Sequence, residues 1–137
     1  MGDKRALFIV LLILCFVLST FSLPLVCAAE DCWVSKASVP TARAFFGVAV
    51  VDGKIYAIGG AGGVNEAYDP ETNTWTTKKP MPNPRTSFAI AAYENKIYCI
   101  GGYTNETHSA TGANEVYDPA TDTWETKTAM PTPRCVA

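Results

Sequence analysis

The sequence is poor in the residues and motifs on which most enzyme active sites depend. It contains one histidine, His108, and has no H-E-x-x-H, C-x-x-C or G-x-S-x-G pattern. A single histidine cannot build a multi-histidine metal site from this chain alone. The missing patterns also leave no hydrolase nucleophile or zinc-bound water to assign. The sequence therefore predicts no catalytic residue, no metal and no cofactor.

Charge of either sign is also scarce. The chain has 11 basic and 13 acidic residues and a net charge of −2. This balance provides no electrostatic attraction toward nucleic acid or an anionic membrane surface, so neither is an expected partner.

A long apolar run occurs only at the start of the chain. Lys4 and Arg5 precede the apolar residues 6–18, and small residues end the segment near residue 29. This order is typical of a secretory signal peptide, which we predict over residues 1–29. The mature chain, 30–137, is then secreted, either extracellular or periplasmic. The alternative is an uncleaved segment that anchors the protein in a membrane, because 6–26 is long enough to cross a bilayer.

Cysteine is sparse after the predicted leader. Cys99 lies within an apolar run and corresponds to Ala57 in a repeat described below, so a buried structural residue is expected. Cys32 and Cys135 lie near opposite ends of the mature chain. Export permits disulfides, but the odd count leaves a bond between these two an open question.

The rest of the chain contains the same unit twice. Arg43 corresponds to Arg85 at an offset of 42, and after a loop Trp75 corresponds to Trp124 at an offset of 49. The difference is one seven-residue insertion within 103–112. We divide the region into repeat 1 (41–83), repeat 2 (84–132) and the start of a truncated repeat (133–137). Residues 31–40 resemble the end of a preceding repeat, since Trp33 precedes Arg43 by the same ten residues that separate Trp75 from Arg85.

Each full repeat is expected to form four strands, and no stretch after residue 29 has a helical period. The first strands, 45–51 and 88–93, are apolar enough to be buried on both faces. Two-residue hairpin turns follow at Asp52-Gly53 and Glu94-Asn95. The second strands are 54–58 and 96–100, the third 64–68 and 113–117, and the fourth 74–78 and 123–127. Residues 31–40 are expected to form a lone outer strand.

These repeats resemble the kelch repeat. The resemblance rests on Ile-Gly-Gly at the end of the second strand, Tyr at the end of the third, and Trp seven residues after that Tyr. It implies an all-β fold of kelch-type β-propeller blades, each a four-stranded antiparallel sheet. The signature residues are expected to be structural, with the glycines allowing close backbone contacts and the aromatic residues packing between blades. They are Gly59, Gly60, Tyr68, Trp75, Gly101, Gly102, Tyr117 and Trp124.

The chain has two complete blades plus one leading strand, whereas propellers typically close with about four to eight blades. We therefore expect an incomplete propeller. The further blades come either from a longer chain, the alternative that we favour, or from other subunits in a ring. In a longer chain, the Trp33 strand would complete the last blade.

The candidate ligand-binding residues lie on one rim of the expected propeller. Arg43, Arg85 and Arg134 precede innermost strands, so they are expected near the mouth of the central channel, where they would suit an anionic ligand. The alternative is that each arginine caps carbonyl groups at a blade junction and binds nothing. The insertion adds Thr104, Asn105 and His108 to the same rim. Asn105-Glu106-Thr107 also fits the N-glycosylation pattern, so Asn105 is a candidate glycosylation site if the chain is exported.

Two classes of function fit these residues. The first is an exported interaction module that recognises a protein or a glycan on the propeller rim and performs no chemistry. The second is part of a sugar-processing enzyme, because the chain also resembles secreted kelch proteins such as the sialic acid mutarotases. The first is preferred, because no acid or base can be assigned to the second.

Overall fold

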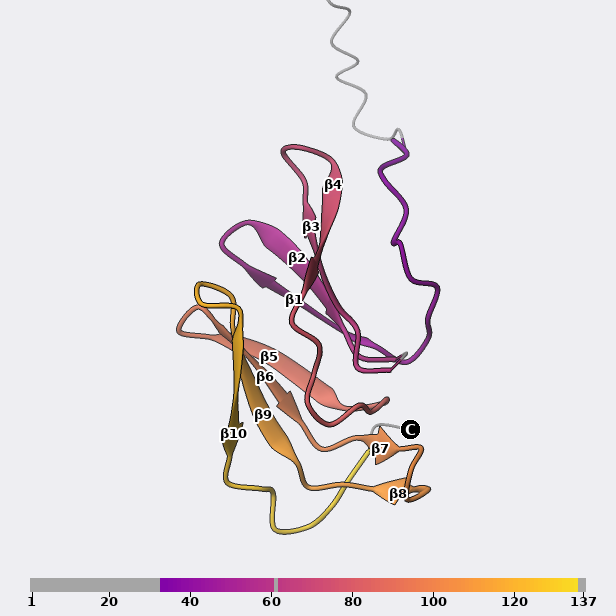
Figure 1. Cartoon of the computed structure of the whole chain (residues 1–137), viewed down its shortest axis with the longest axis vertical. Helices are drawn as coiled ribbons and strands as arrows, with labels where there is room; N and C mark the ends of the chain where they lie inside the picture. Colours follow the sequence, from indigo (N-terminus) through magenta and orange to yellow (C-terminus); the bar gives the residue numbers. More distant parts are fainter. Residues whose placement is uncertain (1–32, 61, 136–137) are drawn as a thin grey trace, which may run out of the picture. The chain divides into compact units, whose positions relative to one another are not determined.

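The computed structural model describes residues 33–60 and 62–135, and the predicted signal peptide lies outside them. Residues 35–135 belong to one compact unit. Within the described residues all regular structure is β (Figure 1), and no helix there is long and apolar enough to cross a membrane. The predicted all-β fold with four-stranded antiparallel sheets is confirmed.

The first sheet comprises β1 (Gly47–Val51), β2 (Lys54–Ile58), β3 (Asn65–Asp69) and β4 (Thr74–Lys78) in sequence order. The second has the order β10-β9-β6-β5. Its strands are β5 (Ala89–Tyr93), β6 (Lys96–Ile100), β9 (Asn114–Asp118) and β10 (Thr123–Lys127). All pairings are antiparallel, so each sheet is an up-and-down blade. The insertion forms a separate hairpin of β7 (Tyr103–Thr104) and β8 (Ser109–Ala110).

The predicted hairpin turns form as expected. Asp52 and Gly53 have φ values of 49° and 70°, and Glu94 and Asn95 have φ values of 49° and 57°. Two consecutive residues with positive φ define the turn that matches the twist of neighbouring strands. The first strands begin later than predicted. Phe45 has a φ of 57°, which lies outside the β region, so β1 starts at Gly47.

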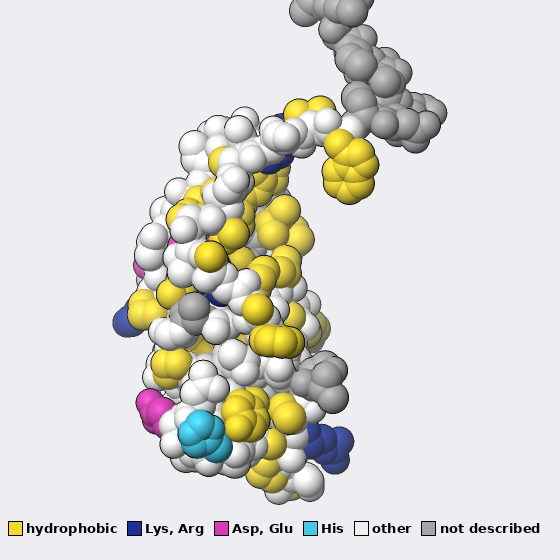
Figure 2. Space-filling model, turned by 90° about the vertical axis from the view of Figure 1, so that its right-hand side faces the viewer, with side chains coloured by type: hydrophobic (Ala, Val, Ile, Leu, Met, Phe, Trp, Pro, Cys, Tyr) yellow, Lys and Arg dark blue, Asp and Glu magenta, His cyan; other side chains and the backbone are white. Residues whose placement is uncertain are grey.

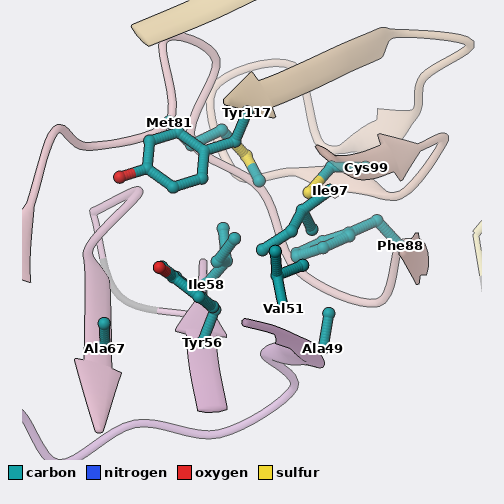
Figure 3. Close-up of a cluster of buried hydrophobic side chains, with 10 residues drawn as sticks. All are labelled: Ala49, Val51, Tyr56, Ile58, Ala67, Met81, Phe88, Ile97, Cys99 and Tyr117. Atoms are coloured by element: carbon teal, nitrogen blue, oxygen red, sulfur yellow. The ribbon is translucent and has the colours of Figure 1, made fainter. Parts of the chain in front are cut away.

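The two blades pack face to face and share one hydrophobic core (Figure 3). Val51 and Ile58 of the first blade point toward Ile97 and Cys99 of the second. Tyr117 also meets Tyr56 across this interface, with ring centroids 5.9 Å apart. The rest of the core comprises Ala49, Ala67, Met81 and Phe88. Neither sheet could bury both of its faces alone, so the stacking of repeats creates the core.

The prediction that the first strands are buried on both faces was wrong. In β1, Ala49 and Val51 are buried, whereas Val48 and Val50 are 50% and 58% exposed. Most of β5 is exposed as well. The reason is that each strand packs one face on the neighbouring blade, and no described residue covers the other face completely.

The leading segment forms no strand over its described residues, 33–40, although a lone outer strand was expected over 31–40. A strand requires backbone hydrogen bonds to a neighbouring strand, and residues 33–40 pair with no strand among the described residues. The contacts of Ala37 nevertheless follow the repeat. Its N–H donates to Asn73 Oδ1 and its carbonyl accepts from Trp75 Nε1, while Lys79 makes the same two bonds with Asp122 and Trp124. The leading segment therefore contacts the first blade through Ala37 in the same way that Lys79, just after β4, contacts the second blade.

Candidate functional site

The two arginines that precede the blades are buried. Arg43 Nη2 lies 2.7 Å from Glu66 Oε2 and 3.1 Å from the carbonyl oxygen of Ala57. Arg85 pairs with Glu115 and donates to the carbonyl oxygen of Cys99 at 2.9 Å. Both arginine side chains are completely shielded from solvent. Each guanidinium thus connects the link before a blade to the second and third strands of that blade.

This geometry supports the second interpretation of the arginines, a role at the blade junction. A carboxylate already balances each positive charge, and carbonyl groups accept several of the guanidinium hydrogens. Arg134 differs, because it is exposed. Its backbone accepts a hydrogen bond from Gly102 and donates one to Thr111, at 2.8 and 3.4 Å. The three arginines therefore do not present a common cationic ring to solvent.

The signature residues make close contacts within each blade and between the second strand and the preceding link. Tyr68 packs on Trp75 and Tyr117 packs on Trp124, with ring centroids 5.2 and 5.1 Å apart. Gly60 and Gly102, with φ of 82° and 110°, directly follow Gly59 and Gly101. A Cβ at Gly60 would lie 2.6 Å from the Ala44 oxygen, and one at Gly102 would lie 2.8 Å from the Thr86 oxygen. Only glycine allows the end of the second strand to approach the link this closely.

Partly buried hydrogen bonds recur at equivalent positions of the two blades as well. The Tyr68 hydroxyl donates to Asn73 Oδ1 at 2.8 Å, and the Tyr117 hydroxyl donates to Asp122 Oδ1 at 2.7 Å. Burial, and secondly the bond to Asp122, raise the pKa of Tyr117 above its ordinary range. The same bond, together with that from the Lys79 N–H, lowers the pKa of Asp122. Burial raises the pKa of the Cys99 thiol to about 12, as expected for a structural cysteine.

The insertion and the inter-blade links share one rim, opposite the hairpin turns (Figure 1). Thr86 exchanges backbone hydrogen bonds with Tyr103 at 2.8 and 3.0 Å, which fixes the start of the insertion to the link. Thr104 is half-buried and lies within hydrogen-bond distance of Thr107, whereas Asn105 and His108 are exposed in the turn of the small hairpin. Exposure of Asn105 is compatible with its use as a glycosylation acceptor. Cys135 is also exposed on this rim, and Cys32 lies outside the described residues.

A depression of about 470 Å³ lies on this rim where the two links meet the insertion. Charged side chains are few on this side of the molecule, which Figure 2 views directly. Two depressions of about 280 and 290 Å³ adjoin the insertion and share Glu106 as a lining residue. We call the depression of about 470 Å³ the rim pocket. It is lined by Ala44, Phe45, Gly60, Thr86, Ser87, Tyr103, Asn105 and Cys135.

The rim pocket gathers the residues that differ between the repeats. In both links an Arg and a Phe enclose two residues, R-A-F-F at 43–46 and R-T-S-F at 85–88. The enclosing residues contact one another, since Arg43 lies 5.4 Å from the Phe46 ring and Arg85 lies 5.7 Å from the Phe88 ring. The enclosed residues, Ala44-Phe45 and Thr86-Ser87, all line the pocket. Tyr103 and Asn105 come from the insertion, which repeat 1 lacks.

Candidate metal ligands do not cluster in the part of the chain that the structure covers. No group of three His, Cys, Asp or Glu side chains lies close enough there to hold a metal ion.

Comparison with known proteins agrees with the architecture. Residues 42–82 and 84–131 each match the kelch motif. The chain belongs to the kelch family. Among solved structures, that of YjhT resembles this kelch chain with a TM-score of 0.68 and 19% identity, over 76% of the chain and 43% of YjhT. The likeness shows the fold, and the chain spans less than half of the YjhT structure. A comparison with curated proteins gives no significant match.

Five residues of the rim pocket were not predicted as candidates from the sequence: Ala44, Phe45, Thr86, Ser87 and Tyr103. Phe45 was predicted in a buried strand, and Ala44, Thr86 and Ser87 were given no role. The available signal was the comparison of the two links, because positions that differ between otherwise matching repeats are not fixed by the shared fold. Of the predicted residues, Asn105 lines the rim pocket, and Thr104 and Arg85 each line an adjoining depression. Arg43, Arg134 and His108 line none of the three.

Proposed function

We propose that this chain is an exported kelch interaction module that binds its ligand in the rim pocket and performs no chemistry of its own. One observation carries the proposal: the residues that hold the fold are repeated, whereas most of the side chains that line the pocket are not. Loops on a rigid scaffold are where binding residues concentrate. The ligand is a protein or a glycan, met outside the cell or in a periplasm.

The pocket has the dimensions and composition of a binding site. Its volume of about 470 Å³ falls within the range of roughly 300–1,000 Å³ that small-molecule sites occupy. It combines apolar surface from Phe45 and Ala44 with uncharged polar groups of Thr86, Ser87 and Asn105. Such sites fix a ligand through a few polar groups among apolar ones.

A sugar-processing enzyme has less support. That alternative relied on arginines to hold an acidic sugar, and Arg43 and Arg85 are buried against Glu66 and Glu115. It also needs an acid or base, for which the rim pocket offers no carboxylate or histidine among its lining residues.

Photo-crosslinking tests the location of the site. We would place p-benzoylphenylalanine at Phe45 or Asn105, and at Tyr93 as a control. Tyr93 is an aromatic residue with 62% exposure beside the opposite hairpin turn, so its exposure is close to the 75% of Phe45. In an extract of the native source, we expect adducts, identified by mass, from positions 45 and 105 and not from position 93. Equal adducts from all three positions, or none from 45 and 105, would contradict the proposal.

A further inference from the structure

The geometry points to a neutral saccharide as the ligand of the rim pocket. This inference rests on the proposed function, because it assigns a chemical class to the ligand of the same site. Three features of the pocket support it: an exposed aromatic ring, uncharged polar groups around it, and the absence of an available cation among the residues that line it.

The aromatic ring belongs to Phe45, which is 75% exposed and has a φ of 57°. A bulky residue with positive φ is a genuine outlier. Ser87, at the equivalent position, has a φ of 51°, so the link sets this conformation in both repeats, and only repeat 1 places a large side chain there. The structure keeps Phe45 in this conformation, since its carbonyl oxygen accepts a hydrogen bond from the Ser87 N–H at 3.0 Å. An exposed aromatic face on a held backbone offers a sugar ring a flat apolar surface for its C–H groups.

Ser87 occupies the place of Phe45 in the second repeat and has nearly the same backbone, with a φ of 51°. The hydrogen bond between these residues sets the two positions side by side on the rim. Each blade therefore presents one side chain at this position of its link. The first blade presents the Phe45 ring, and the second presents the Ser87 hydroxyl beside it. A saccharide displays both kinds of surface, apolar C–H faces and hydroxyl edges.

The polar groups of the pocket are uncharged and able to donate and accept. Ser87 and Thr86 carry hydroxyls, and Asn105 carries an amide with two donors and an acceptor. The backbone N–H and carbonyl of Thr86 are bound to Tyr103, which holds this side of the pocket in place. These groups match the hydroxyls of a sugar, which also donate and accept.

The charges around the pocket disfavour an acidic ligand. The nearest buried cation, Arg85, is paired with Glu115 and its side chain has no exposed surface. Glu106 lines the two adjoining depressions and is itself exposed. Arg134 is exposed but lines neither the rim pocket nor the adjoining depressions, so a carboxylate-bearing sugar would meet the negative charge of Glu106 without an exposed cationic side chain in the lining. A neutral sugar is therefore favoured.

Saturation-transfer NMR on the full chain tests this inference. The probes are methyl glycosides of glucose, galactose, mannose and N-acetylglucosamine, with N-acetylneuraminic acid as the acidic comparison, each at about 10 mM to detect a Kd near ~1 mM. We expect transfer to ring protons of at least one neutral glycoside and none to the acidic sugar. Phe45→Gly should weaken that binding about tenfold or more, because it removes the aromatic face.

Phe45→Gly is a suitable variant because glycine adopts positive φ without strain, so the chain should remain folded, as circular dichroism would verify. Tyr93→Ala, which removes an exposed aromatic residue from the opposite rim, should bind as the parent does. Transfer only to the acidic sugar, no transfer to any probe, or transfer unaffected by Phe45→Gly would overturn the inference. If protein adducts still form at positions 45 and 105, the site stands and the saccharide class alone fails. If those adducts are also missing, the proposed function fails as well.

Discussion

At the scale of single residues, equivalent positions of the two blades act as natural variants of each other. Asn73 and Asp122 accept the same pair of hydrogen bonds, one from a Tyr hydroxyl and one from a backbone N–H. The geometry therefore requires an acceptor oxygen but not a charge. Only the aspartate adds a dependence on pH.

We predict that Asp122→Asn preserves the fold and removes part of the acid sensitivity of the protein. The pKa of Asp122 is lowered from 3.8 in the folded state, so its carboxylate stabilises the fold above about pH 4. This contribution is lost as the pH falls through the lowered pKa. The group is largely solvated, so the effect at pH 7 should be less than about 1 kcal/mol.

Thermal unfolding of both proteins between about pH 2 and 7 measures this effect. The parent should be the more stable protein at pH 7, and the difference should disappear at the acid end. A constant difference across the whole range would contradict the assigned role of the carboxylate.

At the scale of the elements, each blade is tied to its preceding link by a buried ion pair. Arg85 and Glu115 are completely shielded, and Asn83 also donates to Glu115. The pair connects the segment before β5 to β9, two elements that are 30 residues apart in sequence. It therefore fixes the position of the link, and with it the position of the rim pocket residues that the link carries.

Arg85→Ala should destabilise the protein by about 3–5 kcal/mol, because it leaves the Glu115 carboxylate buried without its partner. Arg134→Ala, at the equivalent but exposed position, should change the free energy of unfolding by less than about 0.5 kcal/mol. Urea denaturation of both variants gives the comparison. If Arg85→Ala costs no more than Arg134→Ala, the pair is accessible to water and Arg85 returns as a candidate for ligand binding.

Most of the elements could be predicted from the sequence, because each strand carries its own local signals. The hairpin turns and the glycine pairs set the bounds of the second strands to the residue. The turns over 69–73 and 118–122 set the starts of the fourth strands. The environment of Arg43 and Arg85 was harder, since their glutamate partners are 23 and 30 residues away and only the folded sheet brings them together. Phe45 was predicted in a strand because it continues an apolar run, and a phenylalanine gives no sequence signal for the positive φ that the link requires.

At the scale of the whole molecule, the two blades are neither independent nor self-sufficient. Their shared core spans both sheets, while β1 and β5 each keep one face partly exposed. A propeller closes with about four to eight blades, so we expect these faces to meet further kelch blades. The internal interface shows the chemistry of such a contact, with aliphatic side chains packed beside the Tyr56–Tyr117 pair.

We propose a division of labour in which repeated residues hold the fold and the residues that break the repeat form the binding site. The most direct measurement is the free energy of unfolding of the double variant Ala44→Thr/Phe45→Ser, which gives the first link the residues of the second. We predict a change within about 0.5 kcal/mol, because the exposed Phe45 ring contributes little to the core. A loss of about 2 kcal/mol or more would contradict the claim, since it would show that Phe45 holds the fold.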